Sequence, residues 1–275
     1  MQGKLHQLVF TSVAQGLDQG AHGFCTVARS PELPERLVRE LEARSRYENW
    51  KGARPTIHRY HPLDVNGKRF YILTRIGFAG TDYSHRANHL AHHLILEGDS
   101  ACFTQNPASI LLHWTGFFEK YQGKARWIEP LDLAGFNKSL RKKDGFLPAK
   151  HWEAMTQSGE SAAAWLEATF DSGSVQPLVL MTDKSDTTLL LRAFQEALAL
   201  LPPPLGWEFP FTTFVQEVDV ATEYRWVAGL SGSSVEALAD KLKVQREHLS
   251  PSFSLKCDSA ALRGMAMGRN LFVAE

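Results

Sequence analysis

The chain has 275 residues, and its 30 lysines and arginines balance 30 aspartates and glutamates, so its formal net charge is zero. A hydrophobic fraction of 44% excludes a disordered chain, and neither a glycine period nor sustained heptads point to a fibre. Duplex nucleic acid and anionic membranes reward a basic surplus, so neither is expected as a partner. At ~150 residues per domain, the length indicates about two domains.

The amino terminus and the cysteines both indicate a cytoplasmic protein. The apolar patch Leu8 to Phe10 is too short for a secretory signal, and no stretch approaches the ~18 apolar residues of a membrane span. Cys25, Cys102 and Cys257 are too far apart for a disulfide framework or a zinc site made of cysteines, which fits a reducing compartment. No cofactor is expected, since the phosphate-binding motifs GxxxxGK[ST] and GxGxxG are absent.

The first half of the chain is rich in β-forming segments. In chain order we predict strands over 5–13 and 23–30, a helix over 33–46, a hairpin of 55–63 and 68–80, a helix over 84–97, a short helix and turn over 106–118, and an extended run over 126–133. The pair Asn66-Gly67 between two β-rich runs is a strong hairpin signal. Ser84 is a suitable cap for the His-rich helix and Gly98 a suitable stop.

The second half changes character after a basic turn and Pro148. Here we predict helices over 148–156 and 160–170, a strand over 176–183, a helix over 185–201, strands over 207–215 and 223–230, and a closing helix over 233–243. The expected class is therefore α+β, with two mixed α/β units in series, 1–145 and 146–275, each a small sheet with packed helices. The apolar end of the chain fits either a docking tail or a chain that continues past Glu275.

The densest cluster of reactive side chains lies in the predicted His-rich helix. At ~100° per residue, His85, His89, His92 and His93 fall within one stripe. They could hold a metal ion, although no glutamate stands in the HExxH position. They could instead support acid–base or phosphate chemistry, with Arg86 as an anion clamp and His92 as a proton carrier. The third interpretation, a structural polar face, is the commonest for such clusters, and we favour it.

Aromatic residues gather between 207 and 226. Alternating strand positions predict that one set is buried in a sheet core, which is the simpler interpretation. The sharper one is a surface for a partner protein made by Trp207, Tyr224, Arg225 and Trp226, because Trp, Tyr and Arg concentrate binding energy at interfaces.

Parts of the chain resemble a known family. The opening 7–47, with FTS, GFCTVA and LP in that order, resembles the type-two N-terminal domain of the bacterial GTPase-associated adaptor family. The segment DYSHRANHLAHHLIL resembles the Arg-x-Asn-x3-His signature of the same domain, here Arg86, Asn88 and His92. Residues 189–230, with LP, W-x-x-x-F-T-T-F and YRW, resemble the middle domain that follows it.

This resemblance implies an adaptor or regulator that is encoded beside small GTPases in bacterial conflict or signalling systems, with no established reaction. Our first hypothesis is a non-enzymatic adaptor that binds a small GTPase or another effector component. The alternative is a hydrolase or nucleotide-processing enzyme in which Arg86, Asn88 and His92 converge in an open cleft.

Overall fold

The computed structural model describes residues 4–47, 54–98, 105–140, 148–171, 176–184, 186–215 and 221–268. Cys102 and the apolar end of the chain lie outside these ranges. The protein is of the α+β class, as predicted. It divides into two compact units, Met1–Cys102 with His113–Arg141, and Phe103–Leu112 with Lys142–Glu275. The predicted boundary gives residues 103–112 to the first unit, whereas the contacts place them in the second.

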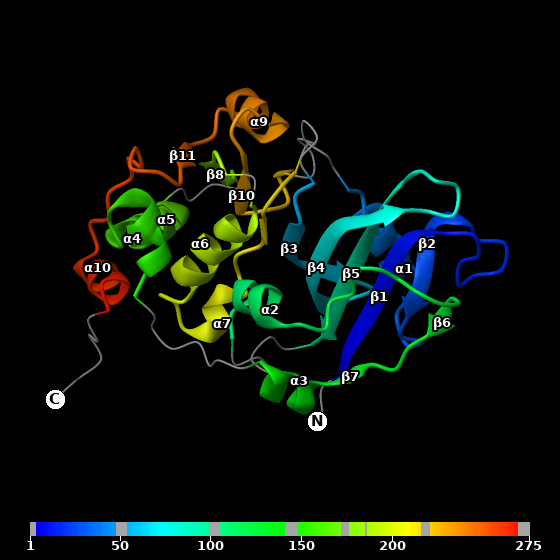
Figure 1. Ribbon diagram of the computed structural model, residues 1–275. Helices are drawn as coiled ribbons and strands as arrows, with labels where there is room; N and C mark the ends of the chain where they lie inside the picture. The colour runs from blue at the N-terminus through cyan, green and yellow to red at the C-terminus, as the bar shows by residue number, and fades with distance from the viewer. Residues whose placement is uncertain are drawn as a thin grey trace. The chain divides into compact units, whose positions relative to one another are not determined.

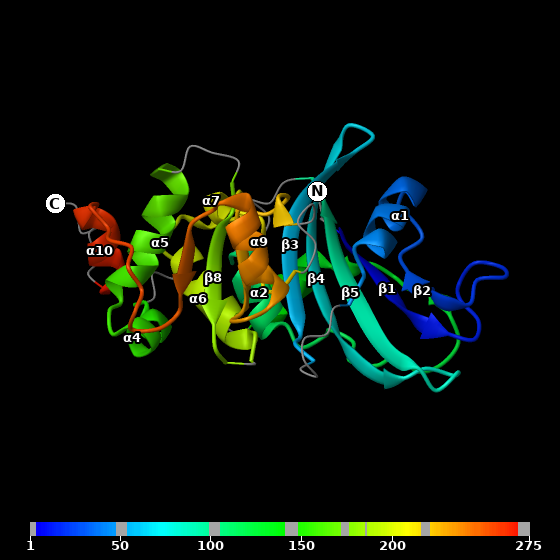
Figure 2. The same ribbon diagram turned by 90° about the horizontal axis from the view of Figure 1, so that it is seen from above.

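The first unit is built on a sheet that Figure 1 draws mainly in blue and cyan. Its elements are β1 (Lys4–Val13), β2 (Gly23–Arg29), α1 (Glu35–Ala43), β3 (Ile57–Val65), β4 (Lys68–Thr81), β5 (Ala87–Glu97), β6 (Arg126–Trp127), β7 (Leu131–Asp132) and α3 (Leu133–Ser139). The strand order is β3-β4-β5-β1-β2-β6, and β7 pairs with β1. Neighbours are antiparallel, except that β2 and β6 are parallel. Figure 2 shows α1 beside β1 and β2.

Most elements of the first unit could be predicted from local sequence patterns. The strands over 5–13 and 23–30, the helix over 33–46 and the hairpin are confirmed, within a few residues at their ends. Asn66 and Gly67 have φ angles of 53° and 75°, as a type I′ turn requires of its two central residues. The apolar side of α1, formed by Leu37, Val38 and Leu41, is buried. The turn residues and the helical spacing were therefore enough to predict the hairpin and α1.

The helix predicted over 84–97 is wrong, because residues 87–97 form β5, a central strand paired with β4 and β1. Every residue from Leu90 to Leu96 is buried, so the strand lacks the polar–apolar alternation that marks a half-exposed one. Leu90 and Leu94 also fit a helical period, which would place the histidines between them on a polar face. His92 and His93 are buried on opposite faces of the sheet, so the alternation that would indicate a half-exposed strand is absent.

The second unit has a parallel sheet, in the order β11-β8-β10-β9. Its elements are most of α2 (Pro107–His113), then α4 (Lys150–Thr156), α5 (Glu160–Asp171), β8 (Leu178–Thr182), α6 (Thr188–Leu198), α7 (Pro203–Gly206), β9 (Phe211–Thr212), β10 (Trp226–Leu230), α9 (Ser234–Leu242), β11 (Arg246–His248) and α10 (Ala260–Ala266). The strand predicted over 207–215 shrinks to two residues, and α9 does not close the unit. Among the described helices, none combines the length and the apolar character needed to cross a bilayer.

Helices cover both faces of this parallel sheet. Val179 and Val227 pack in one core with Val235 and Leu238 of α9. Trp226, the neighbour of Val227 along β10, points the other way, with its ring 5.2 Å from that of Phe194 in α6. Successive strand residues therefore serve two cores, which explains why every residue of β8 and β10 is buried.

Candidate functional site

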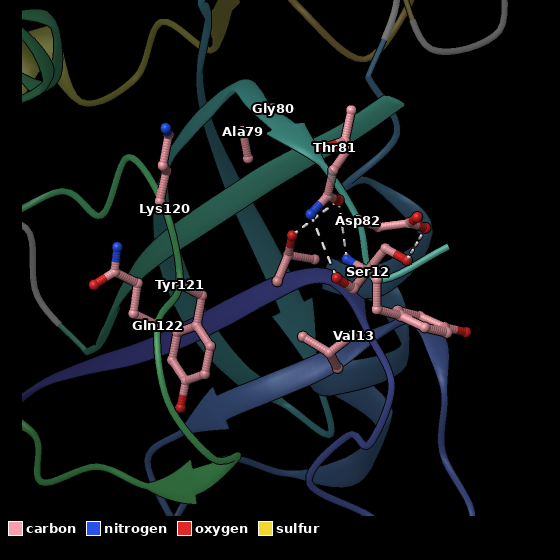
Figure 3. Close-up of a pocket in the computed structure, with 12 residues that line it drawn as sticks. Ser12, Val13, Ala79, Gly80, Thr81, Asp82, Lys120, Tyr121 and Gln122 are labelled. Carbon is pink, nitrogen blue, oxygen red and sulfur yellow. Dashed lines mark hydrogen bonds between the residues drawn. The ribbon is translucent and has the colours of Figure 1, made fainter. Parts of the chain in front are cut away.

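A polar pocket of about 480 Å³ opens in the first unit where the ends of β1 and β4 meet the start of β5 (Figure 3). A loop forms its opposite wall. The lining residues are Thr11, Ser12, Val13, Ala79, Gly80, Thr81, Asp82, Tyr83, Asn88, Lys120, Tyr121 and Gln122. Asn88 is among them, so one of the three signature residues helps to form the pocket.

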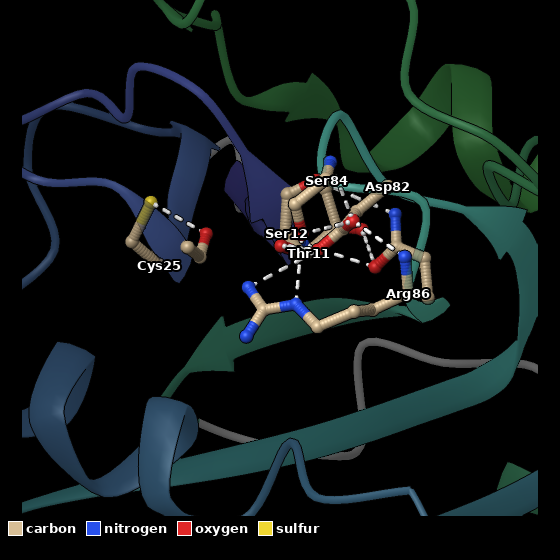
Figure 4. A network of polar contacts seen from close by, with 8 residues as sticks. Thr11, Ser12, Cys25, Asp82, Ser84 and Arg86 are labelled. Carbon is tan, nitrogen blue, oxygen red and sulfur yellow. Dashed lines mark hydrogen bonds and ion pairs between the residues drawn. The ribbon is translucent and has the colours of Figure 1, made fainter.

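Asp82 organises the turn between β4 and β5, as Figure 4 shows. Its Oδ1 accepts hydrogen bonds from Ser84 N at 2.8 Å, Ser84 Oγ at 2.7 Å and Arg86 N at 3.0 Å, and its Oδ2 accepts one from Ser12 Oγ at 2.8 Å. Burial raises the pKa of this carboxyl, but the hydrogen bonds from Ser84, Arg86 and Ser12 outweigh it and hold the pKa well below its usual range. Asp82 is thus a permanent acceptor and not a proton carrier.

Arg86 lies outside the pocket lining on this turn. Its guanidinium is 3.5 Å from Oδ2 of Asp82, and its Nε donates to Ser84 Oγ at 2.7 Å. The Arg86 side chain is 69% exposed, so its ion pair contributes little stability. Arg86 is available to solvent but is directed at its own turn.

Asn88 joins β5 to the end of β1. Its Oδ1 accepts from Ser12 N at 3.1 Å and lies 3.1 Å from Thr11 Oγ1, while its Nδ2 donates to Ser12 O at 3.4 Å. Backbone pairing between the two strands ends at Thr11 and Leu90. The amide therefore continues the ladder by one side chain, in the manner of a backbone peptide group.

We expect Asn88→Ala to lower the free energy of unfolding by ~1–3 kcal/mol, since Ser12 N would lose its partner. Urea denaturation followed by circular dichroism measures the change. Gln122→Ala is the matched control, because Gln122 lines the same pocket but makes no hydrogen bond within the described parts of the chain. Unchanged stability together with lost partner binding would contradict a structural role for Asn88.

His92 is fully buried and both its ring nitrogens are used. Nδ1 accepts a hydrogen bond from Phe118 N at 3.1 Å, so the proton sits on Nε2, which donates to Gln7 Oε1 at 3.2 Å. The rings of Trp114, Phe117 and Phe118 surround the imidazole at 5.0–5.7 Å between centroids. Burial, with a smaller effect of Arg75, lowers its pKa to about 3. His92 is a neutral structural group that fixes the start of the pocket's loop.

The other three histidines do not join His92. His93 points to the opposite face of β5, where its nitrogens lie 2.8 Å from Ser45 Oγ and 2.8 Å from Thr74 Oγ1. His89 stacks on Phe24 at 4.3 Å, and His85 stands in the turn with a φ of 64°. Within the described ranges, no three His, Cys, Asp or Glu side chains gather as metal ligands. The single histidine stripe depends on the helix predicted over 84–97, and the strand β5 excludes it.

The buried histidines predict a pH-dependent stability. Burial lowers the pKa of both His92 and His93 to about 3, against 6.5 in an unfolded chain. Between those values the unfolded state binds more protons than the folded state, so the free energy of unfolding falls as pH falls. Urea titrations at several pH values across this interval measure the slope, and His93→Gln should reduce it. An unchanged slope in that variant would contradict this.

The signature residues do not converge. Asn88 and His92 are four residues apart on one strand, a separation of ~13 Å at ~3.3 Å per residue. Arg86 precedes the strand on an exposed turn, Asn88 lines the pocket, and His92 is enclosed by aromatic rings. A shared reacting atom would have to lie within ~3 Å of the groups that act on it.

The aromatic residues proposed as a partner surface are interior. Trp207, Tyr224 and Trp226 are each no more than 1% exposed, which corrects the interface hypothesis for all three. The indole of Trp207 donates to Gln105 O at 3.1 Å. Arg225 is partly buried, and its Nη2 donates to Thr169 O at 2.6 Å. Trp226 lies on β10, a strand with both faces covered, whereas Trp207 and Tyr224 lie outside the strands and are buried by tertiary packing.

Sequence reasoning missed the loop residues Lys120, Tyr121 and Gln122 and the central role of Ser12. The loop carries no motif, and contacts from distant parts of the sequence hold it beside the pocket, among them the hydrogen bonds from Phe118 N to His92 and from Tyr121 Oη to Val27 O. Asp82 followed two residues later by Ser84 is a typical turn pair, so that part was detectable.

Comparison with known proteins gives a family match for the first part of the chain. Residues 4–133 match the family model described as GTPase-associated protein 1, N-terminal domain type 2. No curated protein and no solved structure matches the chain. The resemblance of residues 189–230 to the middle domain of the same family remains a prediction.

Proposed function

We propose that this chain, whose residues 4–133 match the family model of GTPase-associated protein 1, N-terminal domain type 2, is a non-enzymatic adaptor or regulator. It acts by binding a protein, either a small GTPase or another effector component. The observation that carries this proposal is the use of the signature: Asn88 and His92 are engaged in internal hydrogen bonds that shape a pocket. A family signature that builds a surface fits recognition better than chemistry.

The proposed setting is the bacterial cytoplasm, in a conflict or signalling system linked to a GTPase. The separated cysteines fit a reducing compartment, and the zero net charge argues against nucleic acid as the main partner. The hydrolase alternative has less support, because His92 has no free nitrogen and Asp82 is saturated with hydrogen bonds.

Affinity purification of the tagged chain from its native cells tests this function. Parallel extracts receive GTP, a non-hydrolysable GTP analogue or GDP, and the captured proteins are identified by mass spectrometry. We expect a GTPase that is retained in one nucleotide state and released in the other. A folded chain recovered alone in all three extracts would contradict the proposal.

A further inference from the structure

A second pocket, of about 270 Å³, lies next to the polar pocket along β4. Its floor is apolar, formed by Phe78, Leu90 and Phe118, and its rim is basic, formed by Arg54, Arg75 and Lys120. We call this site the basic-rimmed pocket. Lys120 lines both pockets, and β4 runs from one to the other through Phe78 and Ala79. The two pockets therefore form neighbouring parts of one binding surface.

The lining of the basic-rimmed pocket contains three cationic side chains and one carboxylate, that of Glu119. Arg54 lies over the ring of Phe78, 3.6 Å from its centroid. Neither Arg54 nor Lys120 has a hydrogen bond or ion pair within the described ranges. Arg75 pairs with Glu119 at 3.4 Å, but the carboxylate side chain is 79% exposed and the pair is weak. Three cations around one carboxylate leave an excess of two positive charges, which an anionic occupant would neutralise.

The surface is held in place by the family signature. Phe118 supplies part of the apolar floor, and its backbone N–H is bonded to His92. Asn88 lines the polar pocket and joins the ends of β1 and β5. The floor and walls are thus preorganised, while the cations at the rim stand on long, adaptable side chains.

We infer that the two pockets bind an acidic, extended segment of the protein partner, in which an Asp or Glu stands next to an apolar residue. The carboxylate lies among Arg54, Arg75 and Lys120, and the apolar side chain packs against the half-buried Phe118. The rest of the segment reaches the polar pocket, where Gln122 offers hydrogen-bonding groups. This inference rests on the proposed function, since the segment belongs to the partner of the adaptor.

The lining favours a peptide over a free phosphate compound. Many phosphate sites add backbone N–H groups of a helix N-terminus or a glycine-rich loop to their Arg and Lys side chains. The basic-rimmed pocket is lined by β4, β5, residues that precede β3 and the loop that carries Phe118, with no helix among the lining elements. Its apolar floor also requires carbon atoms from the occupant, which an acidic residue with an apolar neighbour supplies.

Selection from a phage-displayed library of random linear peptides on the full chain tests the inference. We expect enriched peptides that place Asp or Glu beside an apolar residue. Their affinity, measured by fluorescence anisotropy, should fall about tenfold or more in the double variant Arg54→Glu with Lys120→Glu, and should weaken as salt is raised. The matched control is Lys68→Glu with Arg69→Glu, which makes the same change of charge on β4 away from the pocket.

The inference would be overturned by no acidic enrichment, by equal affinity of the peptides for the rim variant, or by an equal loss of affinity in the control. Stabilisation of the chain by inorganic pyrophosphate with no acidic peptide selected would assign the pocket to a phosphate compound instead. A captured GTPase that binds the rim variant as well as the wild type would refute this inference and leave the adaptor function standing. Acidic peptides selected with no partner protein captured in any extract would support the pocket and contradict the function.

Discussion

Replacing His92 by alanine should lower the free energy of unfolding by ~3–5 kcal/mol. The imidazole is 0% exposed and fills a space between the rings of Trp114, Phe117 and Phe118. Its removal leaves a cavity, and it also leaves Phe118 N and Gln7 Oε1 without the partners they now have. Both losses act on the folded state alone, so they add to the destabilisation.

Urea denaturation measures this effect, and His22→Ala is the control, since His22 is exposed. We expect the control to remain within ~0.5 kcal/mol of the wild type. Hydrogen exchange should also show the loop that follows Phe118 opening in His92→Ala, because its anchor is gone. If the variant instead kept its stability and lost a catalytic activity, His92 would be a proton carrier, and the enzyme alternative would replace the adaptor.

The contrast between His92 and the hairpin shows which parts of the fold were predictable. Asn66 and Gly67 determine their turn through their own backbone conformations, so the local sequence was enough. The strand β5 is determined by its neighbours, because β4 and β1 pair with it on both edges and bury its histidines. Those contacts come from residues far away in the sequence, and the local pattern favoured a helix.

The same limit applies to the site. Arg86, Asn88 and His92 could be singled out from the sequence, and Asn88 does line the pocket. Their roles could not be derived, because a helix and a strand place residues four positions apart very differently: on one face ~6 Å apart, or ~13 Å apart. Lys120 and Arg54 come from segments that carry no motif, and only the fold brings them to the basic-rimmed pocket.

Trp226→Ala should destabilise the second unit by ~3–5 kcal/mol. The indole is 0% exposed, with its ring 5.2 Å from Phe194, 5.7 Å from Phe209 and 6.1 Å from Trp165. Its Nε1 donates to Thr169 Oγ1 at 2.9 Å, so truncation also removes a buried hydrogen bond. Aromatic contacts of this kind contribute beyond the area that they bury.

Hydrogen exchange resolved along the chain separates the two units, and we expect the loss of protection in β8, β10 and α6. Trp127→Ala is the control, since Trp127 is 52% exposed and should cost far less. Thr169→Val with Trp226 retained isolates the hydrogen bond, which should account for ~0.5–1.5 kcal/mol of the total. A Trp226→Ala protein that remains fully protected but loses its partner would place Trp226 at an interface. That result would contradict its buried packing in the second unit.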